Sequence, residues 1–362
     1  MFNQENFNRQ DEFTAEEIEK VSDISNNYDD LEGAETSEYA VFFRQPTIEE
    51  TEQKEIYKTA TVIGICFILL EATVYGISKL LKYLLVNLNW SAEQKLAFFG
   101  TPAFSQLYQI VVSITAFIIP FLLVYKIAGY NISELASFKK PRKKTALPLF
   151  FIGIGSCMVA NLLSSAAGQF FENNGVDYEV NFGEDPQGVF GVALSILATV
   201  VTAALVEEFI CRGLVLGALR KYGDGFSIFA SALLFGLMHR NFVQIPFAFL
   251  IGLVLGYVTI KTGGLWVAIA IHAFNNGFSV LFDYLSLPIN VMNFIYLGLM
   301  IVILFTGIFG IYLLKDKNDA FEISNVTTKN TFLQKNLAFF VSIPIVIFVI
   351  YCIYEACGYF VG

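Results

Sequence analysis

Two adjacent glutamates and an arginine, Glu207, Glu208 and Arg212, lie in an otherwise apolar stretch of the chain. If this stretch is an α-helix, Glu208 and Arg212 lie on one face and can form an ion pair. Glu207 then points away from that pair, so one carboxylate is neutralised and the other is free to accept a proton. Carboxylates in such different environments are typical of general acid–base chemistry. A helix end at the membrane surface would explain a lone Glu–Arg pair equally well.

The chain contains only two histidines, His239 and His272, and both lie in or at the end of apolar segments. Phe235 precedes the first by four positions and Asn276 follows the second by four, so each pair shares a helical face. A single histidine in such a segment is more often a packing residue, whereas two of them near a carboxylate pair indicate a site. The imidazole of His272 and the amide of Asn276 offer two hydrogen-bond donors, which suits an oxyanion.

The segments that must position these residues are apolar enough to cross a membrane. Hydrophobic residues make up 55% of the 362 positions and charged residues only 15%, a balance unlike that of soluble domains. Runs of about 20 apolar residues, the length that spans a bilayer, occur near 58–80, 107–126, 147–170, 188–206, 226–241, 244–260, 264–285, 291–314 and 336–357. The sequence therefore predicts an all-α fold, a polytopic transmembrane helical bundle of about eight or nine spans.

Depth along the predicted helices provides an independent check on the site. At 1.5 Å per residue, Glu207 and His239 each lie about 20 Å from the inner ends of their helices. His272 and Asn276 lie roughly 12 to 18 Å from the inner end of theirs. Antiparallel packing would bring all four side chains to similar depth.

The first 56 residues differ in composition from the rest of the chain. They hold 16 Asp and Glu residues against 4 Lys and Arg, and they contain no continuous apolar run. We expect residues 1–56 to be an acidic, mostly disordered tail and residues 57–362 to form a polytopic membrane domain. The basic run at residues 139–144 places the loop after the second span in the cytoplasm. Counting back along the spans, the N-terminus is predicted to be cytoplasmic too.

Three polar motifs follow one another on successive predicted helices: Glu207-Glu208-xxx-Arg212, Phe235-xxx-His239 and His272-xxx-Asn276. In order and spacing they resemble the signature of the CAAX prenyl endopeptidase and bacteriocin-processing family, also called the Abi family. The resemblance covers residues 187–285, which would form the catalytic core. It implies an intramembrane endopeptidase of the CAAX-protease type, in the cell membrane of a bacterium.

The resemblance also implies a role for each motif. Glu207, with His239, would activate a water molecule for attack on a peptide carbonyl. His272 and Asn276 would stabilise the developing oxyanion.

The Glu208–Arg212 pair would hold the first motif in place. The expected partners are a membrane-associated or lipidated peptide or protein substrate and the lipid bilayer, with no nucleic acid.

A metal ion is the main alternative for activating the water. Glu207, His239 and His272 could form a zinc site with one carboxylate, two histidines and an open position. The chain lacks a His-Glu-xx-His segment, and Asn276 makes a better oxyanion donor than a fourth ligand. We therefore favour a glutamate-type mechanism with no metal or other cofactor, and keep zinc as the alternative.

Two non-peptidase functions are also compatible with the sequence. A non-catalytic immunity or scaffold protein of the same fold could bind a peptide or partner. Such a protein would have no use for the buried ionisable side chains, which are energetically costly within a membrane. A proton-coupled transporter could use Glu and His as a relay, but no inverted repeat is visible. Two further acidic residues in the outer predicted helices, Glu71 and Glu355, are not accounted for by the motifs. We expect them at interfaces between helices rather than in the cavity.

Overall fold

The computed structural model describes residues 46–176, 188–285, 287–315 and 328–358, and every regular element in these ranges is a helix. The sequence explains this, because long apolar runs in lipid must satisfy their backbone hydrogen bonds internally. All nine predicted segments are helical over most of their length. The prediction of an all-α, polytopic helical bundle is confirmed.

Six of the described helices or helix series are long and apolar enough to cross a membrane: α2 (Ile48–Asn87), α4 to α5 (Pro102–Ile127), α7 (Lys143–Asn173), α8 to η6 (Gly188–Tyr222), α12 (Gln244–Thr262) and α14 (Ile289–Leu314). A seventh span is possible if α15 (Phe332–Phe340) and α16 (Ile343–Cys357), which meet at an 80° bend, are taken together.

Six or seven candidate spans, judged by length and composition, are roughly consistent with the eight or nine predicted, and two helices fall outside this set. Helix α11 (Asp224–Leu237) has 14 residues, about 21 Å of helix, which is shorter than the hydrocarbon core. Helix α13 (Trp266–Tyr284) has 19 residues but carries several polar side chains, among them His272 and Asn276. Helix α11 carries Phe235 of the second motif, and α13 carries His272 and Asn276 of the third.

The start of the membrane domain differs from the sequence-based boundary at residue 57. Helix α2 begins at Ile48, so residues 48–56 are helical and do not belong to a disordered tail. Glu49 and Glu50 lie in the first turn, where negatively charged side chains interact favourably with the helix dipole and stabilise the helix. Ile56, further along the same segment, is fully buried. Residues 1–45 of the predicted tail lie outside the described residues.

The helix series that carries the glutamates changes its winding on both sides of them. Its parts are α8 (Gly188–Ser195), η4 (Ile196–Thr202), α9 (Ala203–Glu208), η5 (Phe209–Val215), α10 (Leu216–Leu219) and η6 (Arg220–Tyr222). Both η4 and η5 are π-helical, a winding that is rare and often found at functional sites. The short helix α9, which contains both glutamates, therefore lies between two π-helical segments.

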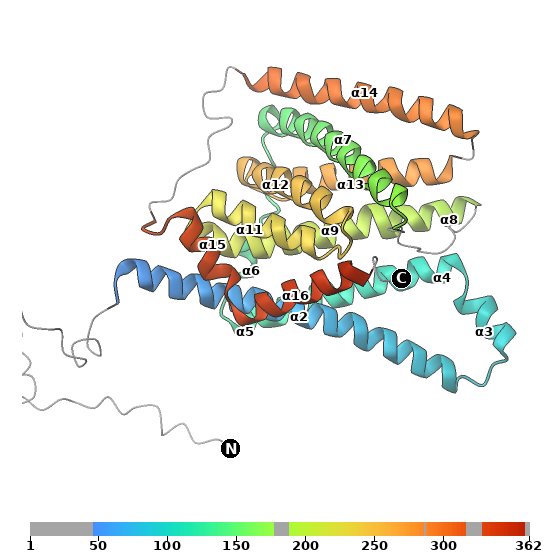
Figure 1. Cartoon of the computed structure of the whole chain (residues 1–362), viewed down its shortest axis with the longest axis horizontal. Helices are drawn as coiled ribbons and strands as arrows, with labels where there is room; N and C mark the ends of the chain where they lie inside the picture. Colours follow the sequence, from blue (N-terminus) through green and yellow to red (C-terminus); the bar gives the residue numbers. More distant parts are fainter. Residues whose placement is uncertain (1–45, 177–187, 286, 316–327, 359–362) are drawn as a thin grey trace, which may run out of the picture. The chain divides into compact units, whose positions relative to one another are not determined.

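The other helices pack around this series in two groups (Figure 1). Helix α13 lies against η4 and α9, and α11 lies against α12 and η5. Helix α7 packs between α14 and α12, while α15 and α16 pack on α2. Residues that are far apart in the sequence, at the two ends of the membrane domain, are therefore neighbours.

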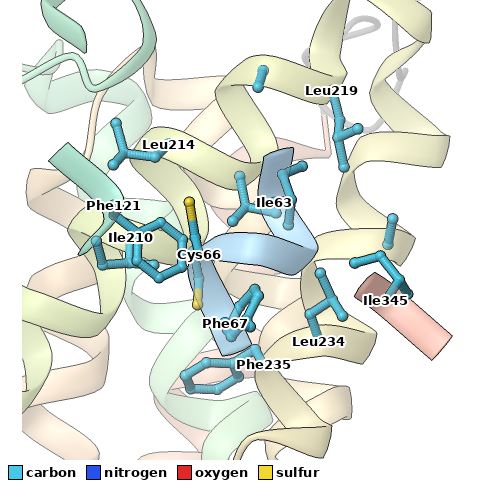
Figure 2. Close-up of a cluster of buried hydrophobic side chains, with 14 of the residues drawn as sticks. Ile63, Cys66, Phe67, Phe121, Ile210, Leu214, Leu219, Leu234, Phe235 and Ile345 are labelled. Carbon is cyan, nitrogen blue, oxygen red and sulfur yellow. The ribbon is translucent and has the colours of Figure 1, made fainter. Parts of the chain in front are cut away.

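A buried hydrophobic cluster joins the outer helices to the helices that carry the motifs (Figure 2). Its labelled members include Ile63, Cys66 and Phe67 from α2, Phe121 from α5, Ile210 and Leu214 from η5, Leu234 and Phe235 from α11, and Ile345 from α16. Phe67 stacks on Phe348 of α16, with 4.6 Å between ring centroids. A second cluster joins α7, α12, α13 and α14.

Helices α11 and α12 approach each other closely at Gly252. A Cβ atom added at Gly252 would lie 2.9 Å from both the Cα and the Cβ of Ala232 on α11. The Gly252 and Gly256 pair is a small-xxx-small pattern, which permits such close packing of membrane helices.

We expect the substitution Gly252→Ala to destabilise the protein by about 1–3 kcal/mol, because the added methyl group overlaps the backbone of α11. The matched control is Gly298→Ala on α14, where no described atom lies within 4 Å of the added Cβ. Thermal unfolding of the detergent-solubilised variants would measure both effects. Equal melting temperatures for the two variants would contradict the close approach.

Candidate active site

A cavity of about 90 Å³ lies among four helical segments, and its lining contains Glu207, Phe235, His239, Phe247, Ala248, Ile251, His272, Asn275 and Asn276. The space is large enough for a few water molecules. Of the six site residues predicted from the sequence, four line this cavity. The other two, Glu208 and Arg212, lie behind it and contact its lining.

Glu208 and Arg212 form a fully buried ion pair. The Arg212 Nη1 donates to Glu208 Oε1 at 2.9 Å, and neither side chain is exposed to solvent. The guanidinium also lies over the ring of Phe235, 4.1 Å from its centroid, a favourable cation–π contact. The ion pair expected from the i,i+4 spacing is therefore present, and Phe235 of the second motif packs directly on it.

Three polar atoms of this pair have no hydrogen-bond partner among the described residues: Arg212 Nε, Arg212 Nη2 and Glu208 Oε2. Because buried charges are strongly destabilising when they lose their partner, removal of either Glu208 or Arg212 would leave the other charge uncompensated. The pair is therefore a buried structural interaction that helps to fix the positions of Phe235 and His272.

His272 lies between the two glutamates. Its Nδ1 is 2.8 Å from Glu208 Oε1, and its Nε2 is 3.9 Å from Glu207 Oε2. The first distance is a hydrogen bond, whereas the second leaves a gap that is too long for one. Glu208 therefore orients the imidazole, and Nε2 is turned towards the side of the cavity where Glu207 lies.

His239 is oriented by the backbone of its own helix. Its Nδ1 lies 2.8 Å from the carbonyl oxygen of Phe235, one turn earlier. Because a carbonyl can only accept a hydrogen bond, Nδ1 carries the proton, and Nε2 of the neutral ring is an acceptor. The ring of His239 thus presents a basic nitrogen away from its helix.

The two π-helical segments each offer a backbone carbonyl to a neighbouring helix. Asn276 Nδ2 donates to the carbonyl of Thr199 in η4 at 2.9 Å. Ser231 Oγ donates to the carbonyl of Cys211 in η5 at 2.6 Å. A π-helical turn shifts the regular hydrogen-bond ladder, so a polar side chain of a neighbouring helix can bond to a carbonyl there. In this way η4 orients the predicted oxyanion donor Asn276.

Asn275 also lines the cavity, although the motifs did not single it out. Its Oδ1 accepts a hydrogen bond of 3.1 Å from Asn161 Nδ2 on α7. Its Nδ2 makes only a 3.5 Å contact with Asn276 Oδ1, at the limit of hydrogen bonding. The signal that could have found it is the presence of two consecutive amides in an apolar helix. The apolar lining residues carried no such signal.

The residues considered for zinc share this cavity. No group of three or more His, Cys, Asp or Glu side chains in the described ranges is arranged to hold a metal ion. Glu207, His239 and His272 therefore do not form a ready-made ligand set in this arrangement. The Nδ1 atoms of both histidines bond to protein oxygens.

Comparison with known proteins points to one family. Residues 189–278 match the family model described as type II CAAX prenyl endopeptidase Rce1-like. The chain is 27% identical over 169 residues to the membrane-embedded CAAX protease MroQ of Staphylococcus aureus (strain USA300), covering 43% of this chain and 66% of that relative's length. No solved structure matches the chain.

The family match spans the segment that contains all three motifs, and it agrees with the helical architecture. The segment that carries the three motifs is therefore similar to the CAAX prenyl endopeptidase and bacteriocin-processing family.

Proposed function

We propose that this protein is an intramembrane endopeptidase that hydrolyses a peptide bond of a membrane-associated or lipidated peptide or protein. The observation that carries the proposal is the convergence of Glu207, His239, His272 and two asparagines on one small cavity. The family and the named relative, a CAAX protease, support the reaction class. On the loop charges, we place the N-terminus and the opening of the site on the cytoplasmic side.

Water activation would use Glu207 and His239. A water molecule in the cavity can donate one hydrogen bond to the Glu207 carboxylate and the other to His239 Nε2. Glu207 takes the proton as the water oxygen bonds to the substrate carbonyl carbon. When the carbon–nitrogen bond then breaks, that proton passes to the leaving amine, so Glu207 returns to its carboxylate form.

Oxyanion stabilisation would use His272 and the two asparagines. Since Nδ1 of His272 bonds to Glu208, its Nε2 can donate to an oxyanion only when the ring carries both protons. Glu208, which Arg212 also binds, accepts the Nδ1 hydrogen bond of that imidazolium. Asn276 has committed one amide hydrogen to Thr199 and retains a second, and Asn275 provides another amide group. These donors face the space where negative charge would develop.

The first prediction concerns the proposed base. In proteoliposomes, Glu207→Gln and His239→Ala should each lower cleavage by about 10²- to 10⁴-fold, because general-base catalysis is lost. The probes are a farnesylated peptide ending in a CAAX box and the same peptide without the lipid. In parallel, the membrane peptidome of cells carrying wild type or Glu207→Gln identifies natural substrates.

Undiminished processing by both variants would refute the peptidase proposal. A biological effect such as protection that survives Glu207→Gln would instead favour the non-catalytic immunity or scaffold function. Faster cleavage of the farnesylated probe would show that the enzyme recognises the lipid. Equal cleavage of the two probes would show that it does not.

The second prediction concerns the asparagines. Asn275→Ala and Asn276→Ala should each lower kcat by about 10- to 10³-fold with a small change in KM, because an oxyanion donor acts in the transition state. The control is Asn336→Ala on α15, whose amide, among the described residues, bonds to the backbone of its own helix at Phe332. A normal kcat for Asn275→Ala would remove that residue from the proposed donor set.

The third prediction concerns metal. We expect cleavage by the purified protein to survive exhaustive chelation and not to rise when zinc is added, because the proposed base and donors are all protein groups. Loss of activity on chelation followed by recovery with zinc would show the alternative, with Glu207, His239 and His272 as the ligands.

A further inference from the structure

Glu71, which the motifs left unassigned, is paired with an arginine next to the site. Its Oε2 accepts a hydrogen bond of 2.7 Å from Arg240 Nη1. The Glu71 side chain is 13% exposed and that of Arg240 is 35% exposed, so Glu71 is mostly buried and Arg240 is half-buried. Glu71 lies on α2, outside the region that matches the family model, whereas Arg240 directly follows His239.

Arg240 has an unusual backbone conformation. With φ at 54°, it is the one non-glycine residue of the described chain in the left-handed region. Glycine is favoured at such positions, and other residues adopt them only where the surroundings hold them there. The Arg240 amide bonds to the carbonyl of Leu237 at 3.0 Å, which closes the end of α11. An interaction that holds Arg240 therefore also holds the turn that follows α11.

The turn around His239 is held on both sides. Before it, the ring of His239 bonds to the carbonyl of Phe235. After it, the side chain of Asn241 accepts from the amides of Val243 at 2.9 Å and Gln244 at 3.2 Å, which starts α12. Arg240 lies between His239 and Asn241, and its side chain contacts Glu71 on α2.

The outer helices provide a firm anchor for this link. Arg240 Nη1 also lies 3.4 Å from the hydroxyl of Tyr351 on α16. Helices α2 and α16 pack on each other and share one buried cluster with Phe235 (Figure 2). The partners of Arg240 are thus fixed relative to the helix that carries the second motif.

We propose that the Glu71–Arg240 ion pair is a positioning device that holds the left-handed turn at Arg240 and so sets the orientation of His239. Glu71 and Arg240 are positioning residues, since neither lines the cavity. The effect on catalysis rests on the proposed peptidase function, whereas the effect on the imidazole does not.

The direct test uses the fact that the chain has only two histidines. Diethyl pyrocarbonate modifies unprotonated imidazole nitrogens, and mass spectrometry of the full-length protein in detergent gives a separate rate for His239 and His272. Glu71→Gln keeps the size of the side chain, Arg240→Gln leaves a shorter, uncharged polar side chain, and each removes the ion pair. We expect each to change the rate at His239 severalfold and to leave the rate at His272 unchanged.

Two further variants separate positioning from general stability. The reversed pair, Glu71→Arg with Arg240→Glu, should return the His239 rate towards the wild-type value. Arg220→Gln breaks a different ion pair, the 2.9 Å contact between Arg220 and Asp224 within one stretch of chain and away from the cavity, and should change neither rate. Unchanged rates at His239 in both Gln variants, or parallel changes at both histidines, would overturn the proposal.

The same variants can be assayed on the peptides whose processing depends on Glu207. There we expect kcat to fall by about 10- to 100-fold with little change in KM, as for a misplaced catalytic group. If Glu207→Gln alters no peptide, the peptidase function fails while the histidine rates still decide the positioning role. If Glu207→Gln abolishes processing but the Gln variants are normal in both assays, only the positioning role fails.

Discussion

The buried ion pair of Glu208 and Arg212 constrains the rest of the site. Two charges removed from water must keep their partners, and here Arg212 bonds to Glu208 and stacks on Phe235, while Glu208 also bonds to His272. One pair therefore ties together the helices of all three motifs. Any helix shift that separated them would expose an uncompensated charge to an apolar interior, so the relative positions of α9, α11 and α13 are strongly restrained.

The regular α-helix is interrupted where this arrangement requires it. The π-helical segments on either side of α9 provide carbonyls at Thr199 and Cys211, which accept hydrogen bonds from Asn276 and Ser231. These bonds connect the glutamate helix to α13 on one side and to α11 on the other. The π-helical winding thus leaves backbone carbonyls free to bond to side chains on neighbouring helices and to orient them.

The outer helices contribute to the site without entering it. Helices α2 and α16 bury apolar side chains against η5 and α11, and they place Glu71 and Tyr351 beside Arg240. The segment that matches the family model is thus embedded in helices that lie outside the match. These helices give the second motif a support that its own sequence does not contain.

The sequence by itself determined the features that depend on neighbouring positions. Apolar runs predicted the helices, and i,i+4 spacing predicted the Glu208–Arg212 pair and the shared face of His272 and Asn276, because helical geometry links residues a turn apart. Only the tertiary structure decided which groups meet across helices. His272 with Glu208, Asn276 with Thr199 and Arg240 with Glu71 are separated by 64, 77 and 169 residues. No periodicity encodes such contacts, since they depend on how whole helices pack.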